Sequence, residues 1–323
     1  MIGVTLISIV SLIFSLSGLA ASSTARVSTF DWNAIKYVYA FGDSYSFVQG
    51  TDGHANFSFI GDALDLSFTP TQLLTNEIVP RNTSSEASNW LEFLTGCFGG
   101  RPSACRKQLW NFAFAGADID GALLPLHHDF TVPLVDQVNQ WVQFASKVIS
   151  HPVGQTLTTW WIGINDTGDT VTNTTITDFN AFWELEMTSY FKAVQIATNN
   201  GLRAHLFLNV PPEERSPATI SSPTKAALMK EHILQFNTIL SKHITAFKAS
   251  NPGKCVTVLT FDANTWFNSV LDAPASFGFN NVTGFCTCAE PTGFFWFNSG
   301  HPTERVHKLL AGAVEAQLLR GAS

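Results

Sequence analysis

The chain has 323 residues, of which 18 are Lys or Arg and 25 are Asp or Glu, so its formal charge is −7. Hydrophobic residues make up 45% and charged residues 13% of the chain, about half the charged share of an average soluble domain. This composition excludes intrinsic disorder, which combines low hydrophobicity with high net charge. The acidic balance also argues against a nucleic-acid partner, because phosphate recognition needs a basic surface.

The N-terminal segment 1–20 contains no charged side chain and is nearly continuous in apolar and small residues up to Leu19. It ends in Gly18-Leu19-Ala20, a small-x-small cleavage pattern, and so predicts a secretory signal peptide over 1–20. An uncleaved signal anchor is the alternative, because the apolar run is nearly long enough to span a bilayer. We expect residues 21–323 to form a single secreted, monomeric domain with no stable membrane insertion after cleavage.

Strand and helix patterns alternate along the mature region. Short runs rich in β-branched and aromatic residues predict strands, and apolar residues recurring every three or four positions predict helices. In chain order we expect strands 37–41 and 109–112, helix 135–149, strand 157–162, helix 179–198, strand 204–209, helix 225–247, strand 256–261 and helix 303–319. This alternation predicts an α/β fold, a flavodoxin-like three-layer αβα sandwich around a mainly parallel sheet.

Polar residues and a glycine suited to catalytic chemistry follow the predicted strands. Ser44, Gly116 and Asn165 come shortly after the first three strands, and His301 stands just before the last helix. Sites in open α/β sheets form at the carboxyl ends of the strands, so these residues are expected to meet there. A hydroxyl nucleophile, an imidazole base, and amide donors for an oxyanion are the groups that acyl transfer requires.

Four segments resemble the characteristic blocks of the GDSL, or SGNH, hydrolase family in their order and approximate spacing. They are Gly42-Asp43-Ser44, residues 111–118, Gly163-Ile164-Asn165-Asp166 and residues 297–302. The resemblance implies that Ser44 is the nucleophile and His301 the base. It also implies an oxyanion hole made by the backbone N–H groups of Ser44 and Gly116 and the side chain of Asn165.

The residues that flank the first and last blocks narrow this resemblance. Tyr39-Ala40-Phe41 and Phe295-Trp296-Phe297 are similar to fungal secreted members, especially carbohydrate esterase family sixteen. That similarity implies removal of acetyl groups from plant cell-wall sugars, with a small-molecule or oligosaccharide ester as substrate. A lipase or esterase for longer acyl chains is the alternative. Aromatic residues near the blocks, such as Trp160 and Trp161, either line the ester pocket or belong to the core.

One position departs from the family pattern. Asn298 stands three residues before His301, where the family usually carries Asp. Asn can orient an imidazole but brings no charge to stabilise the imidazolium. Three hypotheses follow: a Ser44–His301 dyad oriented by Asn298 or a backbone carbonyl, a substitute carboxylate such as Glu290 or Glu304, or a weakened, carbohydrate-binding paralogue.

Cysteines and sequons are consistent with secretion. Cys97 and Cys105 enclose a short loop and are expected to form a disulfide. A bridge from Cys255 to Cys286 or Cys288 is favoured over a strained ring closed between the last two. The Asn-x-Ser/Thr pattern predicts N-glycosylation at four positions, namely Asn56, Asn82, Asn173 and Asn281. The fifth sequon, at Asn165, is discounted because of that residue's predicted place in the oxyanion hole.

Two short segments, one acidic and one containing histidines, only weakly resemble metal-binding motifs. Residues 118–121 lack most ligand positions of a calcium loop, and we expect a turn there. His127 and His128, followed by Asp129, are expected to be solvated. The sequence therefore predicts no metal and no cofactor.

Overall fold

The computed structural model describes residues 30–61, 65–252 and 255–321, so the predicted signal peptide over 1–20 lies outside the described residues. Its centre is a five-stranded, wholly parallel sheet in the order β4-β1-β5-β6-β7. The strands are β1 (Tyr37–Gly42), β4 (Gln108–Asn111), β5 (Thr156–Trp161), β6 (Ala204–Leu208) and β7 (Thr257–Phe261). All five lie within a residue or two of the predicted ranges.

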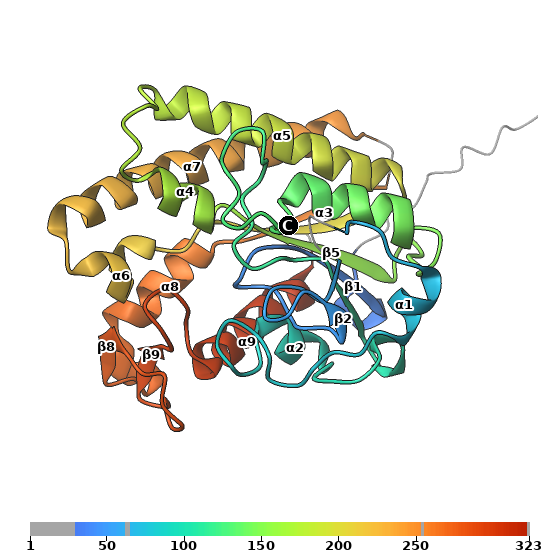
Figure 1. Cartoon of the computed structure of the whole chain (residues 1–323), viewed down its shortest axis with the longest axis horizontal. Helices are drawn as coiled ribbons and strands as arrows, with labels where there is room; N and C mark the ends of the chain where they lie inside the picture. Colours follow the sequence, from blue (N-terminus) through green and yellow to red (C-terminus); the bar gives the residue numbers. More distant parts are fainter. Residues whose placement is uncertain (1–29, 62–64, 253–254, 322–323) are drawn as a thin grey trace, which may run out of the picture.

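Helices cover both faces of the sheet. One layer contains α3 (Leu134–Gln140), α5 (Phe179–Asn199) and α7 (Pro223–Ser250), and the other contains α2 (Trp90–Thr95) and α9 (Glu304–Arg320) (Figure 1). Within the layers α5 packs against α3 and α7, and α2 packs against α9. The predicted three-layer αβα sandwich is therefore confirmed.

Shorter elements fill the connections between the main strands and helices. They are β2 (Asp52–Gly53), β3 (Ile60–Gly61), α1 (Pro70–Thr75), α4 (Ile164–Thr170), α6 (Pro217–Ile220), α8 (Ala263–Asp272), β8 (Asn281–Phe285) and β9 (Phe294–Trp296). The predicted helix 135–149 differs from the structure, because α3 ends at Gln140 and continues as a π-helical turn over Trp141–Ala145. The wholly buried Trp141 starts that turn and packs edge-on against Tyr39 and Phe41 of β1.

Aromatic side chains of the central strands form part of the core. Every residue of β5 is buried, as expected of a strand that helices cover on both faces. Phe41 of β1 stacks on Trp160 of β5 with ring centroids 4.8 Å apart. Eight of the nine Trp side chains are 2% exposed or less. Trp160 and Trp161 are fully buried, so they belong to the core and not to a pocket wall.

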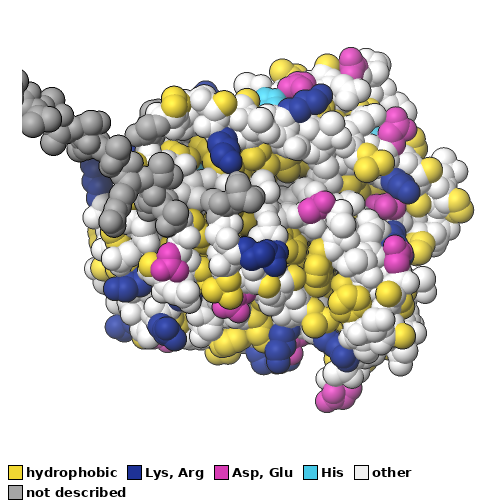
Figure 2. All heavy atoms as spheres, turned by 180° about the vertical axis from the view of Figure 1, so that it is seen from behind, with side chains coloured by type: hydrophobic (Ala, Val, Ile, Leu, Met, Phe, Trp, Pro, Cys, Tyr) yellow, Lys and Arg dark blue, Asp and Glu magenta, His cyan; other side chains and the backbone are white. Residues whose placement is uncertain are grey.

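Charged side chains are sparse on the surface as well. Figure 2 shows Lys, Arg, Asp and Glu scattered singly or in pairs over one face, between hydrophobic and neutral polar atoms. Among the described residues, no helix has both the length and the apolar character needed to cross a bilayer.

The disulfides bear out one cysteine prediction and correct another. Cys97 and Cys105 are bonded as expected, which ties the end of α2 to the segment before β4. Cys286 and Cys288 are bonded to each other, with Cα atoms 5.2 Å apart, and Cys255 is free and exposed. The predicted bridge from Cys255 is wrong because Cys255 precedes β7, at the amino end of the sheet. Cys286 instead hydrogen-bonds to Trp296 of β9, which leads towards His301.

Candidate active site

Ser44 lies in a tight turn directly after β1. Asp43 Oδ1 accepts a hydrogen bond of 2.9 Å from the Tyr45 N–H and closes the turn. The Gln137 side chain brackets Gly42, accepting from its N–H at 3.0 Å and donating to its carbonyl at 2.8 Å. Ser44 itself is 9% exposed. Its hydroxyl is thus held by a buried and well-anchored backbone.

His301 reaches Ser44 across most of the chain. Its Nε2 lies 2.8 Å from Ser44 Oγ, although 257 residues separate the two. The loop between β9 and α9 carries the imidazole, and Asn298 Oδ1 holds that loop by accepting from the N–H groups of Gly300 and His301 at 3.0 and 2.8 Å. The structure therefore brings together the first and last of the four sequence blocks.

The contacts of Asn298 also determine where the imidazole carries its proton. Two backbone N–H groups point at Asn298 Oδ1, and since an N–H can only donate, this atom must be the amide oxygen. His301 Nδ1 lies 3.0 Å from the same oxygen and so must donate to it. Nε2 is then free to accept the Ser44 proton. Burial lowers the pKa of His301 to about 4, so the ring is neutral near pH 7.

Neither substitute carboxylate lies at His301. Glu304 Oε1 accepts from Arg81 at 3.0 Å and from the Ser88 N–H at 3.1 Å. Glu290 is exposed, and both glutamates line a separate surface groove. The hypothesis that one of them replaces the family's Asp is wrong, because the last block directs His301 Nδ1 to Asn298.

Asn165 and Gly116 lie on neighbouring segments at the carboxyl ends of β5 and β4. Gly163, with φ of 112°, turns the chain into α4, and Asn165 follows in the first turn of that helix. Its Nδ2 donates to the carbonyl of Ala117 at 2.9 Å, which places the amide beside Gly116.

The backbone of Gly116 is suited to an exposed N–H donor. Gly116 has φ of 82°, a left-handed conformation that a side chain disfavours, and a Cβ there would come within 3.3 Å of the His127 Cβ. Within the described part of the chain, the N–H groups of Ser44 and Gly116 have no hydrogen-bond acceptor.

A cavity of about 260 Å³ opens beside Ser44, Asn165 and His301. Its other walls include Ile164, Asp169, Glu213, Ser216, Lys225 and Met229. The walls combine apolar side chains, such as Ile164 and Met229, with polar ones, so the cavity offers both an apolar contact and hydrogen-bonding groups to a substrate.

A buried pair of Tyr45 and Glu213 supports the loop that carries His301. The sequence did not predict this pair. Tyr45 Oη lies 2.8 Å from Glu213 Oε1 and 2.6 Å from the Gly300 carbonyl oxygen. Burial raises the pKa of Glu213 to about 8, so near pH 7 its carboxyl is protonated and can donate to Tyr45, which then donates to Gly300. Glu213 follows β6, so a search of every strand end would have found it.

Comparison with known proteins identifies the family of the chain. The model of the family described as GDSL-like lipase/acylhydrolase matches residues 38–314, most of the chain. The chain belongs to that family. This GDSL-family protein is therefore a hydrolase that acts on ester bonds.

Relatives of this GDSL-family protein include an acetylesterase from Thermothelomyces thermophilus. The two are 29% identical over 287 residues, which cover 86% of this chain and 87% of the relative. Similar solved structures include an extracellular lipase from Streptomyces rimosus, at 15% identity and a TM-score of 0.42, which covers 87% of this chain and 99% of the lipase. An acetylxylan esterase from Geobacillus stearothermophilus shares 12% identity at a TM-score of 0.45, with 88% and 94% covered.

Proposed function

We propose that this GDSL-family hydrolase is a secreted acetyl esterase that removes acetyl groups from plant cell-wall carbohydrates. Ser44 is the nucleophile, His301 is the general base, and Asn298 orients His301. The contact of 2.8 Å between Ser44 Oγ and His301 Nε2 carries the proposal, because a serine hydroxyl is a weak nucleophile until a base takes its proton.

In the first half-reaction, Ser44 Oγ attacks the acetyl carbonyl carbon while its proton passes to His301 Nε2. The carbonyl oxygen becomes an oxyanion, which accepts hydrogen bonds from the N–H groups of Ser44 and Gly116 and from Asn165 Nδ2. The intermediate collapses as the bond to the sugar oxygen breaks. His301 gives its proton to that oxygen, and the acetyl group stays on Ser44.

In the second half-reaction, water attacks the acetyl-serine and gives its proton to His301 Nε2. Collapse of this second intermediate breaks the bond to Ser44 Oγ, which takes the proton back, and acetic acid leaves. Throughout, His301 Nδ1 keeps its proton and donates a hydrogen bond to Asn298 Oδ1, 3.0 Å away. Asn298 therefore fixes the tautomer, although it brings no negative charge to the imidazolium.

The cavity has room for a short acyl group next to side chains that can contact a sugar. An acetyl group fits within about 260 Å³, and the polar side chains of Glu213, Ser216 and Lys225 offer hydrogen bonds to a sugar. The relative from Thermothelomyces thermophilus is named as an acetylesterase, which supports the same substrate class.

Residues 1–20 direct the chain to secretion and are then removed, which leaves 21–323 as the catalytic domain. The disulfide between Cys97 and Cys105 supports an oxidising compartment. N-linked glycans at Asn56, Asn82, Asn173 and Asn281 complete this part of the proposal, since each of these side chains is exposed or half-buried. Asn165 stays unglycosylated, because its Nδ2 donates to the Ala117 carbonyl at 2.9 Å and belongs to the proposed oxyanion hole.

The substrate proposal is tested by comparing kcat/KM on acetylated xylo-oligosaccharides with kcat/KM on long-chain nitrophenyl esters. We expect a clear preference for the acetylated sugars, and Ser44→Ala should abolish turnover of both. A marked preference for the long-chain esters would instead show a lipase. Binding of the sugars by wild type and Ser44→Ala alike, without turnover of either ester, would show a non-catalytic carbohydrate-binding protein.

A further inference from the structure

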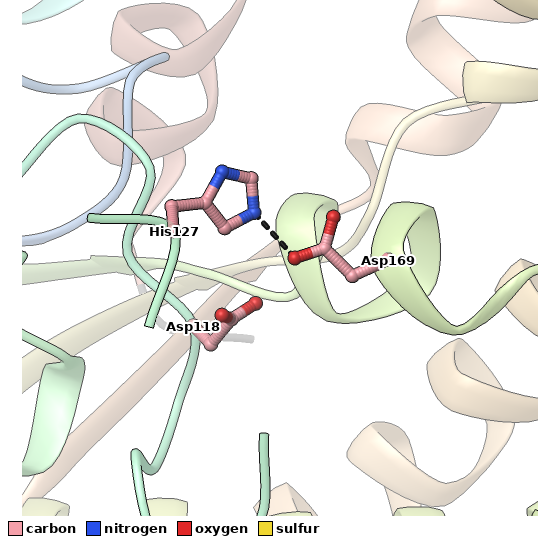
Figure 3. Close-up of side chains that lie close together, drawn as sticks. All are labelled: Asp118, His127 and Asp169. Carbon is pink, nitrogen blue, oxygen red and sulfur yellow. Dashed lines mark ion pairs between the residues drawn. The ribbon is translucent and has the colours of Figure 1, made fainter. Parts of the chain in front are cut away.

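A second group of ionisable side chains lies beside the proposed oxyanion hole. Asp118, His127 and Asp169 each direct one ligand-type atom to a common point, with these atoms all within 4.8 Å of one another. Figure 3 shows Asp118 and His127 on the strand-to-helix connection after β4, and Asp169 on α4 facing them. His127 Nε2 forms an ion pair with Asp169 Oδ2.

Asp118 is the unusual member of this group. It is 1% exposed, and neither of its carboxylate oxygens has a hydrogen-bond partner. In Figure 3 its carboxylate points towards the pair of His127 and Asp169. A buried carboxylate is costly unless a hydrogen-bond donor, a positive charge or a metal ion compensates it.

Two neighbouring carboxyl groups also have oxygens without a hydrogen-bond partner among the described residues. Asp166 Oδ2 and both Glu186 oxygens are also buried without a hydrogen-bond partner, and no Lys or Arg in the described ranges forms an ion pair with these three carboxyl groups. Burial raises the pKa of Asp118 to about 10, so without a cation this carboxyl is protonated, and its oxygens still have no partner. A divalent cation between Asp118 and the half-exposed pair would give the Asp118 oxygens a partner and displace that proton.

We propose that Asp118, His127 and Asp169 bind a divalent first-row transition-metal ion, Zn²⁺ or Mn²⁺. Two carboxylates and one imidazole suit such an ion, whereas Ca²⁺ and Mg²⁺ prefer oxygen ligands alone. The side chains of His127 and Asp169 are 30% and 39% exposed, so the ion can enter from solvent. Water molecules would fill the remaining positions.

The geometry requires small movements only. Ligand oxygens and nitrogens lie about 2.0–2.2 Å from such an ion, so two of them can be at most about 4.4 Å apart. The three ligand atoms lie within 4.8 Å of one another, and rotation of the half-exposed His127 or Asp169 side chain brings them to the separation that the ion requires. The ion would replace the direct contact between His127 and Asp169, and His127 would bind it as neutral imidazole, releasing its proton if it was charged.

The position of the ion gives it a structural role next to the active site. Asp118 is two residues after Gly116, and Asp169 is one helical turn after Asn165. An ion held by both would fasten the Gly116 loop to α4 and so fix two oxyanion donors relative to each other. This consequence rests on the proposed oxyanion hole, whereas binding of the ion does not.

Calorimetric titration of the full mature protein tests the binding itself. The protein is freed of metal with EDTA, dialysed, and titrated separately with ZnCl₂, MnCl₂ and CaCl₂. A Cys255→Ser background prevents the exposed thiol of Cys255 from taking Zn²⁺. We expect one equivalent of Zn²⁺ or Mn²⁺ to bind and to raise Tm, and His127→Gln and Asp169→Asn each to weaken binding at least about tenfold.

A second histidine–carboxylate pair serves as the matched control. His243 Nε2 lies 2.7 Å from Glu184 Oε2, with side chains 25% and 51% exposed. Among the described residues, this pair belongs to no group of three metal ligands. His243→Gln should leave metal binding unchanged. The proposal is overturned if no stoichiometric Zn²⁺ or Mn²⁺ binds, if Ca²⁺ binds as tightly, or if His127→Gln binds like His243→Gln. Because all readouts are binding and Tm, failure of the ester-hydrolase proposal would not affect them.

Discussion

His301 Nδ1 lies 3.0 Å from Asn298 Oδ1, so an amide and not a carboxylate orients the imidazole that contacts Ser44. The same oxygen accepts hydrogen bonds from two backbone N–H groups, which hold the Asn298 amide in this orientation. An Asp at this position would hold the tautomer and also stabilise the imidazolium by its charge. Asn298 supplies only the first of these, and this difference has measurable consequences.

The first consequence concerns the pH profile of the wild-type enzyme. His301 must be neutral to act as a base, and burial lowers its pKa to about 4. We therefore expect kcat/KM to rise with pH through about 4 and to be level between about 5 and 7. Initial rates on an acetyl ester across this range measure it. An acid limb centred near 6.5 would show that no such lowering occurs.

Asn298→Asp should move that acid limb to higher pH. A carboxylate 3 Å from Nδ1 favours the charged imidazolium and so raises the pKa of His301. Turnover on the level part of the profile should be at least that of wild type, because the new charge also stabilises the imidazolium formed during catalysis. A clear loss of turnover in this variant would show that the amide of Asn298 has a role of its own.

Asn165→Ala should lower kcat by about 10²–10³ with little change in KM, which is the usual effect of deleting one oxyanion donor. The free donor is the second hydrogen of Nδ2, since the first bonds to the Ala117 carbonyl at 2.9 Å. Asn139 is a half-buried asparagine on α3 outside the cavity, and Asn139→Ala should leave kcat unchanged. Equal rates in both variants would remove Asn165 from the oxyanion hole.

Tyr45→Phe should slow catalysis and destabilise the protein together. It removes the hydroxyl that lies between Glu213 and the Gly300 carbonyl, next to His301. Loss of these buried hydrogen bonds costs about 1–3 kcal/mol of unfolding free energy, and misplacement of the imidazole can cost up to about 100-fold in kcat.

Tyr190→Phe is the matched control for that change. The Tyr190 hydroxyl is equally buried but has no hydrogen-bond partner among the described residues. Its removal should leave both the unfolding free energy and kcat close to wild type. Urea denaturation and steady-state rates give both quantities, and indistinguishable results for the two variants would contradict a positioning role for Tyr45.

Stability should fall as pH rises from about 6.5 to 8.5. Burial raises the pKa of Glu92, Glu213 and Asp43 to about 8 each, so the folded state holds protons that the unfolded chain has already lost. His205 and His307, whose pKa values burial lowers to about 3, stabilise the fold increasingly up to about pH 6.5 and no further. Tm should therefore decrease above that pH, and less so in Glu92→Gln. A Tm that increases over this window would contradict the expectation.

Much of the fold was predictable because buried parallel strands leave a simple trace in the sequence. β1 and β5 consist mainly of β-branched and aromatic residues and are buried almost throughout, since helices cover both of their faces. Their predicted limits differ from the structure by one residue. The long helices α5, α7 and α9 have several turns, which is enough for periodicity to emerge. Helices of six or seven residues, such as α2 and α4, are too short for this signal.

Contacts between distant segments were not predictable in the same way. Pairing of Cys286 with Cys288 depends on where Cys255 lies relative to the sheet, which spacing does not reveal. The Tyr45–Glu213 contact joins residues 168 positions apart. Asp118 looked like a turn residue, and its burial without a partner is a property of the folded chain.

Mass spectrometry after treatment with an organophosphonate ester tests the central claim most directly. If His301 activates Ser44, the reagent should modify the native protein once, on the peptide that contains Ser44, with loss of esterase activity in step. Ser44→Ala and heat-unfolded protein should remain unlabelled. A native protein whose Ser44 does not react, together with a Ser44→Ala variant that keeps every measured esterase activity, would contradict the account.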